Sequence, residues 1–238
     1  DFVSKRPRNL EFLFKKRFGW MNQYTEGKQL VVDLGSGLGF SREFIMNPIV
    51  LTDIIKYPWT DQQVDALNPP FKDGTVDVFI CSHVVHHLAY PMVFFENIMR
   101  MLKPGGYLVI QELETSLFFK ILLRLMESEG WDLNKDVFNR NAQCTDFDKD
   151  PWSANCAIPH LLFDDPRLFE KNIPGLKVVR NELSECFIFP LSGGVLVKVP
   201  VPTLPLFMLK SIDVIDGVLV SLFPKVFALG RRVVLQKI

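Results

Sequence analysis

The feature that most constrains the fold of this chain is a glycine-rich turn that directly follows an apolar run. Residues 29–34 read QLVVDL, and residues 35–39 read GSGLG. Glycines let a backbone turn tightly and approach a ligand closely, because they carry no Cβ. A dinucleotide-binding fingerprint needs its third glycine at position 40, where Phe40 stands, and no Gly-Lys-Ser/Thr of a triphosphate-binding loop follows. The turn therefore predicts a ligand-binding loop that is not built for a pyrophosphate.

Apolar strands and helical segments alternate along the chain. Strands are predicted at 29–34, 48–55, 75–81, 107–111 and 232–237, and helices at 91–102, 116–129 and 204–223. This alternation is typical of βαβ units in a mostly parallel sheet. Runs such as VVDL and DVFI are almost continuously apolar, as a sheet covered on both faces requires. We therefore expect an α/β domain.

Three segments depart from this alternation. A basic, aromatic-rich helical lead-in occupies 1–28, and a helical excursion at 203–228 precedes the last predicted strand. Between them, 131–174 is polar, rich in turn residues and too long for an ordinary connection, which predicts an inserted lid. We expect all three to belong to one domain spanning 1–238, because this length suits a single large α/β domain.

The formal charge of zero, 27 Lys and Arg against 27 Asp and Glu, is unevenly distributed. Residues 1–28 hold seven basic and three acidic side chains, and residues 198–238 hold six and two, so the middle of the chain is acidic. A neutral chain excludes nucleic-acid binding by bulk positive charge, and we expect no nucleic-acid partner. The two basic ends leave an anionic membrane surface open as a partner.

The compartment is predicted from the cysteines and from the apolar stretches. The four cysteines show no CxxC or zinc-ligand spacing, and no stretch reaches the ~18 uninterrupted apolar residues of a membrane-spanning helix. We therefore expect a reducing, cytoplasmic location. Peripheral attachment to the inner face of the membrane stays open.

An acidic residue follows the glycine turn at a distance that predicts a ribose contact. Asp53 lies near the end of the second predicted strand, 18 positions after Gly35, and a carboxylate at an offset of about 20 residues binds ribose hydroxyls in dinucleotide-binding folds. The spacing predicts an adenosine-like ligand that has a ribose but no pyrophosphate.

The segment VVDLGSGLGF at 31–40 resembles motif I of class I S-adenosylmethionine-dependent methyltransferases. The segments VDALNPPFKDGTVDVFICSHVVHHL at 64–88 and MLKPGGYLVIQE at 101–112 are similar to further motifs of that family, in the same order. The resemblance implies a Rossmann-like, doubly wound sheet that is mostly parallel, with an antiparallel last strand and helices on both faces. It also implies S-adenosylmethionine as the cofactor and methyl transfer as the reaction.

The resemblance assigns cofactor contacts as well. It places the methionine part of the cofactor in the glycine loop, contacted by Asp33, Gly35, Ser36, Gly37 and Gly39. Asp53 would hold the ribose, and the adenine would be met by Ile54, Asp65 and Ala66. Ser82 and His83 would lie beside the sulfonium.

Three of the four histidines, His83, His86 and His87, follow the strand at 75–81 and would share one face of a helix. A sulfonium already activates its methyl group, so a general base is needed only for a poorly ionised acceptor such as an aliphatic hydroxyl. One of these imidazoles could take that proton, His86 or His83 before His87, and Glu112 is a further catalytic candidate just past the strand at 107–111. The residues leave two other roles open: a structural one, and a divalent metal held with Glu112 or Glu114. We expect no metal.

The sequence identifies the acceptor only by class. An acceptor pocket is predicted from aromatic and polar residues after position 130, unless the aromatics pack a small core: Trp131, Phe138, Trp152, Phe163, Asn155 and His160. The apolar stripe of the helix at 204–223 predicts that it covers a sheet, with contact to lipid as the alternative. We expect methyl transfer to an oxygen of a small molecule, a glycan or a lipid-linked intermediate. The alternative is a catalytically idle cofactor-binding module that acts as a membrane-associated interaction protein. The sequence does not predict the oligomeric state.

Overall fold

The computed structural model describes residues 7–127, 129–146, 153–193 and 200–238. Within these ranges seven strands form one sheet in the order β3-β2-β1-β4-β5-β7-β6. The strands are β1 (Val31–Leu34), β2 (Val50–Asp53), β3 (Gln62–Gln63), β4 (Val76–Ser82), β5 (Leu102–Leu113), β6 (Leu176–Ser184) and β7 (Gly230–Lys237).

The sheet is mostly parallel, and its last strand runs against its neighbours. Strands β1 to β5 pair in parallel, whereas β7 lies between β5 and β6 and is antiparallel to both. This confirms the predicted Rossmann-like, doubly wound sheet with an antiparallel last strand. Strand β5 begins five residues earlier than predicted, because a β-bulge against β4 absorbs the KPGG turn at 103–106 without ending the pairing.

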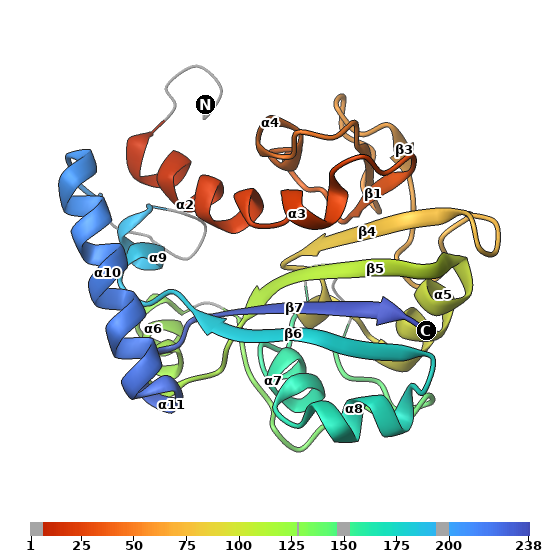
Figure 1. The fold of residues 1–238 in the computed structure, drawn as a ribbon. Coiled ribbons are helices and arrows are strands. Elements are labelled where there is room, and N and C mark those ends of the chain that lie inside the picture. The colour runs from red at the N-terminus through yellow and green to blue at the C-terminus, as the bar shows by residue number, and fades with distance from the viewer. Residues whose placement is uncertain (1–6, 128, 147–152, 194–199) are drawn as a thin grey trace.

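Helices cover both faces of the sheet, as predicted (Figure 1). They are α2 (Arg8–Gly19), α3 (Asn22–Thr25), α4 (Ser41–Phe44), the 3-10 turn η1 (Val85–His87), α5 (Pro91–Met101), α6 (Leu117–Met126), α7 (Ile158–Phe163), α8 (Pro166–Asn172), α9 (Ile188–Leu191), α10 (Leu206–Leu222) and α11 (Pro224–Phe227). The alternation of side chains along each strand divides the core. On β4, Phe79 and Cys81 pack toward α5, α7 and α8, while Val78 and Ile80 pack toward α2 and the residues around α4.

A third apolar cluster lies beyond the carboxyl ends of β5 and β6. Leu113 and Leu183, near the ends of these strands, pack there with side chains of α2, α6, α9, α10 and α11. Figure 1 shows that the arrows of β4 and β5 point toward this end of the molecule, where α10 stands at the left. The carboxyl ends of the parallel strands therefore face α2 and α10.

Part of the segment predicted as an inserted lid belongs to the main core. Ile158 and Phe163 of α7 and Phe169 of α8 are fully buried against α5 and the sheet. This half of 131–174 is a fixed layer over the sheet, because its apolar side chains have no other surface to cover. Residues 147–152 of the segment lie outside the described residues.

Helix α10 turns only part of the expected apolar stripe inward: Leu209 is buried, whereas Met208, Ile215 and Leu222 are exposed. Its buried residues are Leu209, Asp216 and Val220, whereas Phe207, Val214 and Val218 are exposed. The Asp216 carboxylate accepts hydrogen bonds from the backbone N–H groups of residues 186–188, each at 2.9 Å. The orientation of α10 follows from this buried acid, since turning the apolar stripe inward would leave these donors without an acceptor.

We expect Asp216→Asn to lower the free energy of unfolding by about 1–3 kcal/mol, because an amide NH₂ replaces one of two accepting oxygens in a buried site. The matched control is Asp213→Asn, which removes the charge of the half-exposed partner of Lys16 and should cost less than about 1 kcal/mol. Urea unfolding of both variants measures the difference. Equal losses would contradict the anchoring role of Asp216.

Among the helices of the described chain, none combines the length and the apolar character needed to cross a bilayer.

Candidate active site

The structure gathers the predicted cofactor residues at one edge of the sheet. The loop at 35–39 leaves the carboxyl end of β1, Asp53 ends β2, and Ser82 ends β4. Gly35 has a φ of +69°, and a Cβ there would stand 2.5 Å from Val84 Cγ2. The loop therefore packs directly on the segment that carries the histidines, which only a glycine permits.

The loop is also tied to β2 and to the residues that follow it. Asp53 accepts hydrogen bonds from the backbone N–H of Gly37 at 2.8 Å and of Ile55 at 2.9 Å. Trp59, which the sequence did not single out, donates its indole N–H to the Gly37 carbonyl at 2.8 Å. A Cβ on Gly37 would meet no atom of the described residues within 4 Å, so this part of the backbone faces space that they leave open.

The predicted adenine contacts border the same edge. Ile54 is 38% exposed directly after β2. Asp65 follows β3, and its side chain accepts a hydrogen bond from the backbone N–H of Leu67 at 2.8 Å. Ala66 is half-buried against the main core. These residues sit where the parallel strands end, which is where open α/β sheets bind ligands.

Two buried polar atoms at the loop have no partner among the described residues. They are Oδ1 of Asp33 and Oγ of Ser36, while Oδ2 of Asp33 accepts a hydrogen bond from the Ser41 hydroxyl. Burial raises the pKa of Asp33 to about 7, although the Ser41 hydrogen bond opposes the shift. A ligand with an ammonium group would supply both the missing hydrogen bond and the missing charge. The loop therefore fits the methionine end of S-adenosylmethionine.

The three histidines cluster after β4, but they do not share one face of a helix as predicted. His83 lies in a turn with a φ of +58°, and only residues 85–87 are helical, in the 3-10 turn η1. The imidazole ring centroids of His86 and His87 are 4.1 Å apart, and those of His83 and His86 are 6.1 Å apart. Because His83 lies outside this turn, helical spacing does not describe how the three imidazoles meet.

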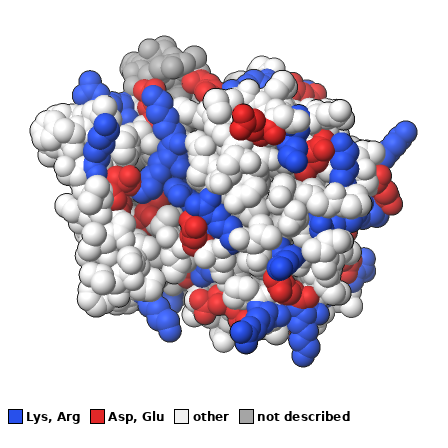
Figure 2. Space-filling model, in the orientation of Figure 1, with Lys and Arg blue, Asp and Glu red and all other residues white. Residues whose placement is uncertain are grey.

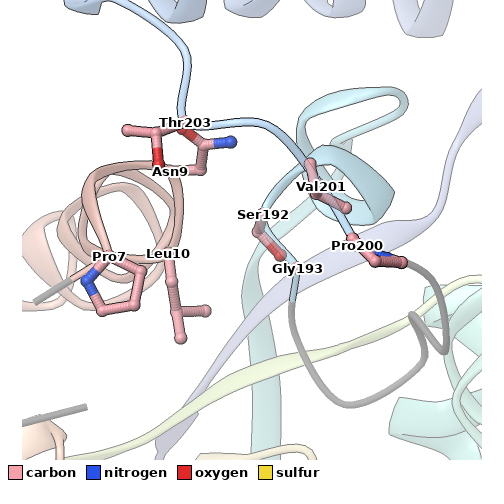
Figure 3. Close-up of a pocket in the computed structure, with 8 residues that line it drawn as sticks. All are labelled: Pro7, Asn9, Leu10, Ser192, Gly193, Pro200, Val201 and Thr203. Atoms are coloured by element: carbon pink, nitrogen blue, oxygen red, sulfur yellow. The ribbon is translucent and has the colours of Figure 1, made fainter. Parts of the chain in front are cut away.

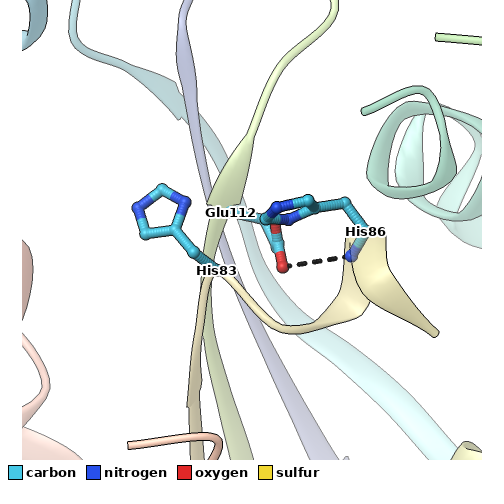
Figure 4. Close-up of side chains that lie close together, drawn as sticks. All are labelled: His83, His86 and Glu112. Carbon is cyan, nitrogen blue, oxygen red and sulfur yellow. Dashed lines mark hydrogen bonds and ion pairs between the residues drawn. The ribbon is translucent and has the colours of Figure 1, made fainter. Parts of the chain in front are cut away.

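Glu112 is part of strand β5 and fully buried, whereas the sequence placed it past the strand (Figure 4). One oxygen of Glu112 lies 2.7 Å from Nδ1 of His86, and the other accepts a hydrogen bond from the backbone N–H of Val85 at 2.6 Å. Burial alone would raise the pKa of Glu112, but the facing imidazole outweighs it and holds this pKa at about 2. Burial likewise lowers the pKa of His86, and the charge of Glu112 reverses the shift and raises it above its usual value.

The opposite nitrogen of His86 faces a second carboxylate, which the sequence analysis did not identify. His86 Nε2 lies 3.6 Å from Glu129, which follows α6 and is partly exposed. Two groups of side chains could donate to a metal ion, and within each group the donor atoms lie within 4.8 Å of one another. The first group is His83, His86 and Glu112, and the second is His86, His87 and Glu129. His86 belongs to both sets and is the centre of the cluster.

His83 and His87 have different surroundings from His86. Burial, followed by the charge of Arg17, lowers the pKa of His83 to about 3, and its Nε2 is buried without a partner among the described residues. Nδ1 of His87 lies 3.1 Å from the carbonyl oxygen of Ser153, and burial lowers its pKa. His86 is therefore the most basic imidazole of the three.

Glu114 and most of the predicted acceptor-pocket residues have structural roles. Glu114 pairs with the buried Arg231 and with His160, so it does not join the histidine cluster as a metal ligand.

Phe163 is buried in the core, and the Asn155 side chain hydrogen-bonds the backbone of residues 132 and 157. Trp131 stacks beneath Arg124 and packs on the cluster beyond β5, Phe138 packs on the main core, and Trp152 lies outside the described residues. The described aromatic side chains therefore follow the packing alternative that the sequence left open.

A buried ion pair beside His83 was also missed by the sequence analysis. Arg17 of α2 and Glu185, which follows β6, approach to 2.6 Å, and the guanidinium stacks on the Phe189 ring at 4.4 Å. The partners are 168 positions apart in the chain, and no local pattern links them. This pair fixes α2 over the carboxyl edge of the sheet.

A pocket elsewhere in the molecule carries no acid–base chemistry. It lies between the start of α2, the end of α9 and the segment that leads into α10 (Figure 3), and is lined by Pro7, Asn9, Leu10, Ser192, Gly193, Pro200, Val201 and Thr203. The Asn9 side chain donates to the carbonyl oxygens of Leu191 and Pro202 and accepts from the backbone N–H of Leu204. Among the described residues the lining contains no titratable side chain, in contrast to the histidine cluster.

Comparison with known proteins agrees with this geometry. Residues 32–110 match the family model described as a methyltransferase domain. The chain is 27% identical over 107 residues to the highly reducing polyketide synthase aurA of Calcarisporium arbuscula, an alignment that covers 45% of this chain and 4% of the synthase. It is 23% identical over 154 residues to fusarielin synthase FSL1 of Gibberella zeae, covering 50% of this chain and 6% of that protein. The chain thus spans only a small fraction of these relatives.

Solved structures show the same fold. A SAM-dependent methyltransferase from Archaeoglobus fulgidus superposes with a TM-score of 0.59 at 18% identity, over 99% of this chain and 98% of that one. The YcgJ protein of Bacillus subtilis gives a TM-score of 0.50 at 14% identity, over 93% and 97% of the two chains. Residues 32–110 thus match a methyltransferase domain, and the chain has the fold of S-adenosylmethionine-dependent methyltransferases of class I.

Proposed function

We propose that this enzyme transfers the methyl group to an oxygen of a small molecule, a glycan or a lipid-linked intermediate, with His86 as the general base. The observation that carries this proposal is the buried His86–Glu112 pair at the carboxyl ends of β4 and β5. A basic imidazole is useful when the acceptor is a weakly acidic hydroxyl, and it is superfluous for an acceptor that is already ionised.

In this proposal Glu112 orients His86. In the neutral imidazole Nδ1–H donates to the carboxylate, so Nε2 is the unprotonated nitrogen that can accept a proton. The cofactor, when bound, supplies a methyl group already activated by its sulfonium. His86 would take the proton of the acceptor hydroxyl at Nε2 while that oxygen takes up the methyl group, which would leave the demethylated cofactor uncharged. Glu129 stabilises the imidazolium that forms, since it faces the same nitrogen.

The proposed cofactor contacts are those that the sequence resemblance assigns. The unpartnered atoms of Asp33 and Ser36, the open space at Gly37 and the exposure of Ile54 support them. Gly35 and Gly39 shape the loop, Asp53 holds the ribose, and Asp65 and Ala66 border the adenine. Ser82 and the neutral His83 lie beside the sulfonium, with His87 as a supporting member of the catalytic group.

A small organic acceptor is supported by the matched relatives, which are named as polyketide synthases. The acidic middle of the chain disfavours a nucleic-acid acceptor, since like charges repel. We propose a cytoplasmic enzyme, and a lipid-linked acceptor would require it to work at the inner face of the membrane.

The proposal is tested by incubating the enzyme with methyl-labelled S-adenosylmethionine and a cell extract, then identifying the labelled product by mass spectrometry. We expect a methyl ether or ester in a small or lipid-linked product. Label found only on nitrogen or carbon would refute the oxygen acceptor. A protein that binds the cofactor in calorimetry but labels nothing in extracts would favour the idle cofactor-binding module.

Cofactor affinity should depend on pH through Asp33. Its pKa of about 7 in the free protein means that it is mostly protonated at pH 6, whereas the cofactor ammonium favours the ionised form. Binding below pH 7 therefore releases a proton, and the affinity falls by up to about tenfold per pH unit below 7 and levels off above it. Titration calorimetry with S-adenosylhomocysteine at pH 6, 7 and 8 measures this slope. Asp33→Asn should remove the slope, and an unchanged slope in that variant would contradict the role of Asp33.

A further inference from the structure

Helix α10 presents an apolar face to solvent. At 100° per residue, Phe207, Val214, Val218 and Leu222 lie on the side opposite the buried Leu209, Asp216 and Val220. These four outward side chains are 52–69% exposed. A helix that covers a core shows the reverse pattern, with its apolar side chains turned inward.

The outward apolar face is fixed by the polar groups on the inner side of α10. Asp216 is fully buried and bonded to the backbone N–H groups of residues 186–188, and Asp213 pairs with Lys16 of α2. Rotating α10 to hide its apolar stripe would break these contacts and expose two acids in exchange. The exposed face is therefore a stable feature of the folded protein.

Helix α6 carries a second exposed apolar stripe at the same end of the molecule. Leu117, Ile121 and Leu125 follow one another at intervals of four residues and are 45–72% exposed. Helix α11 packs on both α6 and α10, and Phe223, directly before it, is 55% exposed. In Figure 2 the left edge of the molecule, where α10 stands, is largely free of charged atoms. Contiguous exposed apolar surface of this kind marks an interaction site.

Most of the exposed charges around this apolar surface are positive, with Glu127 at the end of α6 as an exposed acid. The acids of α10 both point inward, so the exposed charged side chains of α10 and α11 are Lys210 and Lys225. On α6, Lys120 is half-exposed, and the exposed Arg124 lies one position before Leu125. Apolar side chains interspersed with cations are the composition of helices that lie in the headgroup region of anionic bilayers.

We propose that the outer faces of α10, α11 and α6 dock on the surface of an anionic membrane. The apolar side chains stand on the outer sides of separate helices and do not line a groove, and a fluid bilayer adapts to such a surface. The surface lies at the end toward which β4 and β5 run, so the active-site edge is near the membrane (Figure 1). The docking surface contains no proposed cofactor or catalytic residue. The membrane proposal therefore does not depend on the identity of the proposed acceptor.

The test is co-flotation with vesicles of phosphatidylcholine alone or with 30 mol% phosphatidylglycerol added. We expect the intact chain to float with the anionic vesicles at low salt, to bind the neutral ones at least tenfold more weakly, and to be released by high salt. Lys210→Gln and Lys225→Gln should each weaken anionic binding by about fivefold.

The decisive variant is Val214→Ser/Val218→Ser/Leu222→Ser, which removes exposed apolar groups without touching the buried side of α10. We expect it to lose at least tenfold in vesicle binding and to keep its affinity for S-adenosylhomocysteine. The matched control is Met46→Ser/Leu168→Ser/Ile238→Ser, which removes exposed apolar side chains on other elements and should bind vesicles like the parent protein.

Three outcomes would overturn the proposal. The parent protein could fail to float with anionic vesicles, or the α10 variant could float as well as the control variant. The parent protein could also be a dimer by light scattering that the α10 variant dissociates, which would assign the surface to a second copy. Because cofactor binding is measured on every variant, failure of membrane docking is distinguishable from failure of the methyltransferase site.

Discussion

Replacing His86 by Asn should lower the rate of methyl transfer by about 10²- to 10⁴-fold and leave cofactor affinity unchanged. The range is the usual contribution of a positioned general base. The Asn amide nitrogen can take the place of Nδ1 and still donate to Glu112, which is 2.7 Å from that atom in the parent protein. The variant therefore removes Nε2, the proposed proton acceptor, while it keeps the buried carboxylate satisfied.

The chain offers a matched control in a second histidine–glutamate pair. Nδ1 of His160 lies 2.7 Å from Glu114, the same distance as in the His86 pair, but His160 lies on α7 and Glu114 is held by Arg231. His160→Asn should therefore keep the rate within about threefold of the parent enzyme, since it removes no proposed proton acceptor.

Both variants are assayed by transfer of labelled methyl groups into an extract, with cofactor affinity and unfolding midpoints measured alongside. Equal rate losses in the two variants at equal stability would contradict a specific role for His86. An unchanged rate in His86→Asn would eliminate the general-base proposal and favour an acceptor that is already ionised.

Replacing Gly37 by Ala should weaken S-adenosylhomocysteine binding by about 10- to 100-fold. In the described part of the chain no atom lies within 4 Å of the place where the Cβ would stand, so these residues leave room for it. In the proposed site this space belongs to the cofactor, and an added methyl group in a close-packed contact costs about 1–3 kcal/mol. Calorimetry with the demethylated cofactor measures the loss.

Gly74→Ala separates this steric effect from backbone strain. Gly74 has a φ of +64° against +51° for Gly37, and a Cβ on Gly74 would likewise meet no atom within 4 Å. Both substitutions therefore strain a left-handed residue by a similar amount, about 1 kcal/mol, in the free energy of unfolding. If Gly37→Ala bound the cofactor like Gly74→Ala, the glycine loop would not contact the methionine part.

The parts of the fold that the sequence predicted correctly share one property, which is that their signal is local. The runs VVDL and DVFI are apolar on both sides of the strand, and strands β1 and β4 are buried on both faces. The glycine turn after β1 and the acid that ends β2 were also predicted, because spacing along the chain fixes their positions. The predicted start of β5 was five residues too late, because a bulge extends the strand.

The predictions that were wrong concern contacts between distant segments. Glu112 was placed past a strand and is buried inside it, because β7 pairs along the whole end of β5. For Phe163 the sequence left a pocket and a packing role open, and the structure places it in the main core, while Asn155 binds backbone groups. Glu129 was not identified at all, although it lies 3.6 Å from His86, because nothing near it in the sequence indicates a catalytic neighbour.

The sequence by itself determined the doubly wound sheet, the glycine loop and the class of cofactor, because each is encoded in a short segment whose physical requirements are local. Only the tertiary structure decided which histidine is basic, since that depends on a buried carboxylate 26 positions away. It also decided which side of α10 faces outward. The helical pattern predicted an inward apolar stripe, but the buried Asp216 must satisfy three backbone donors 28–30 positions earlier in the chain, and those bonds turn the apolar side to solvent.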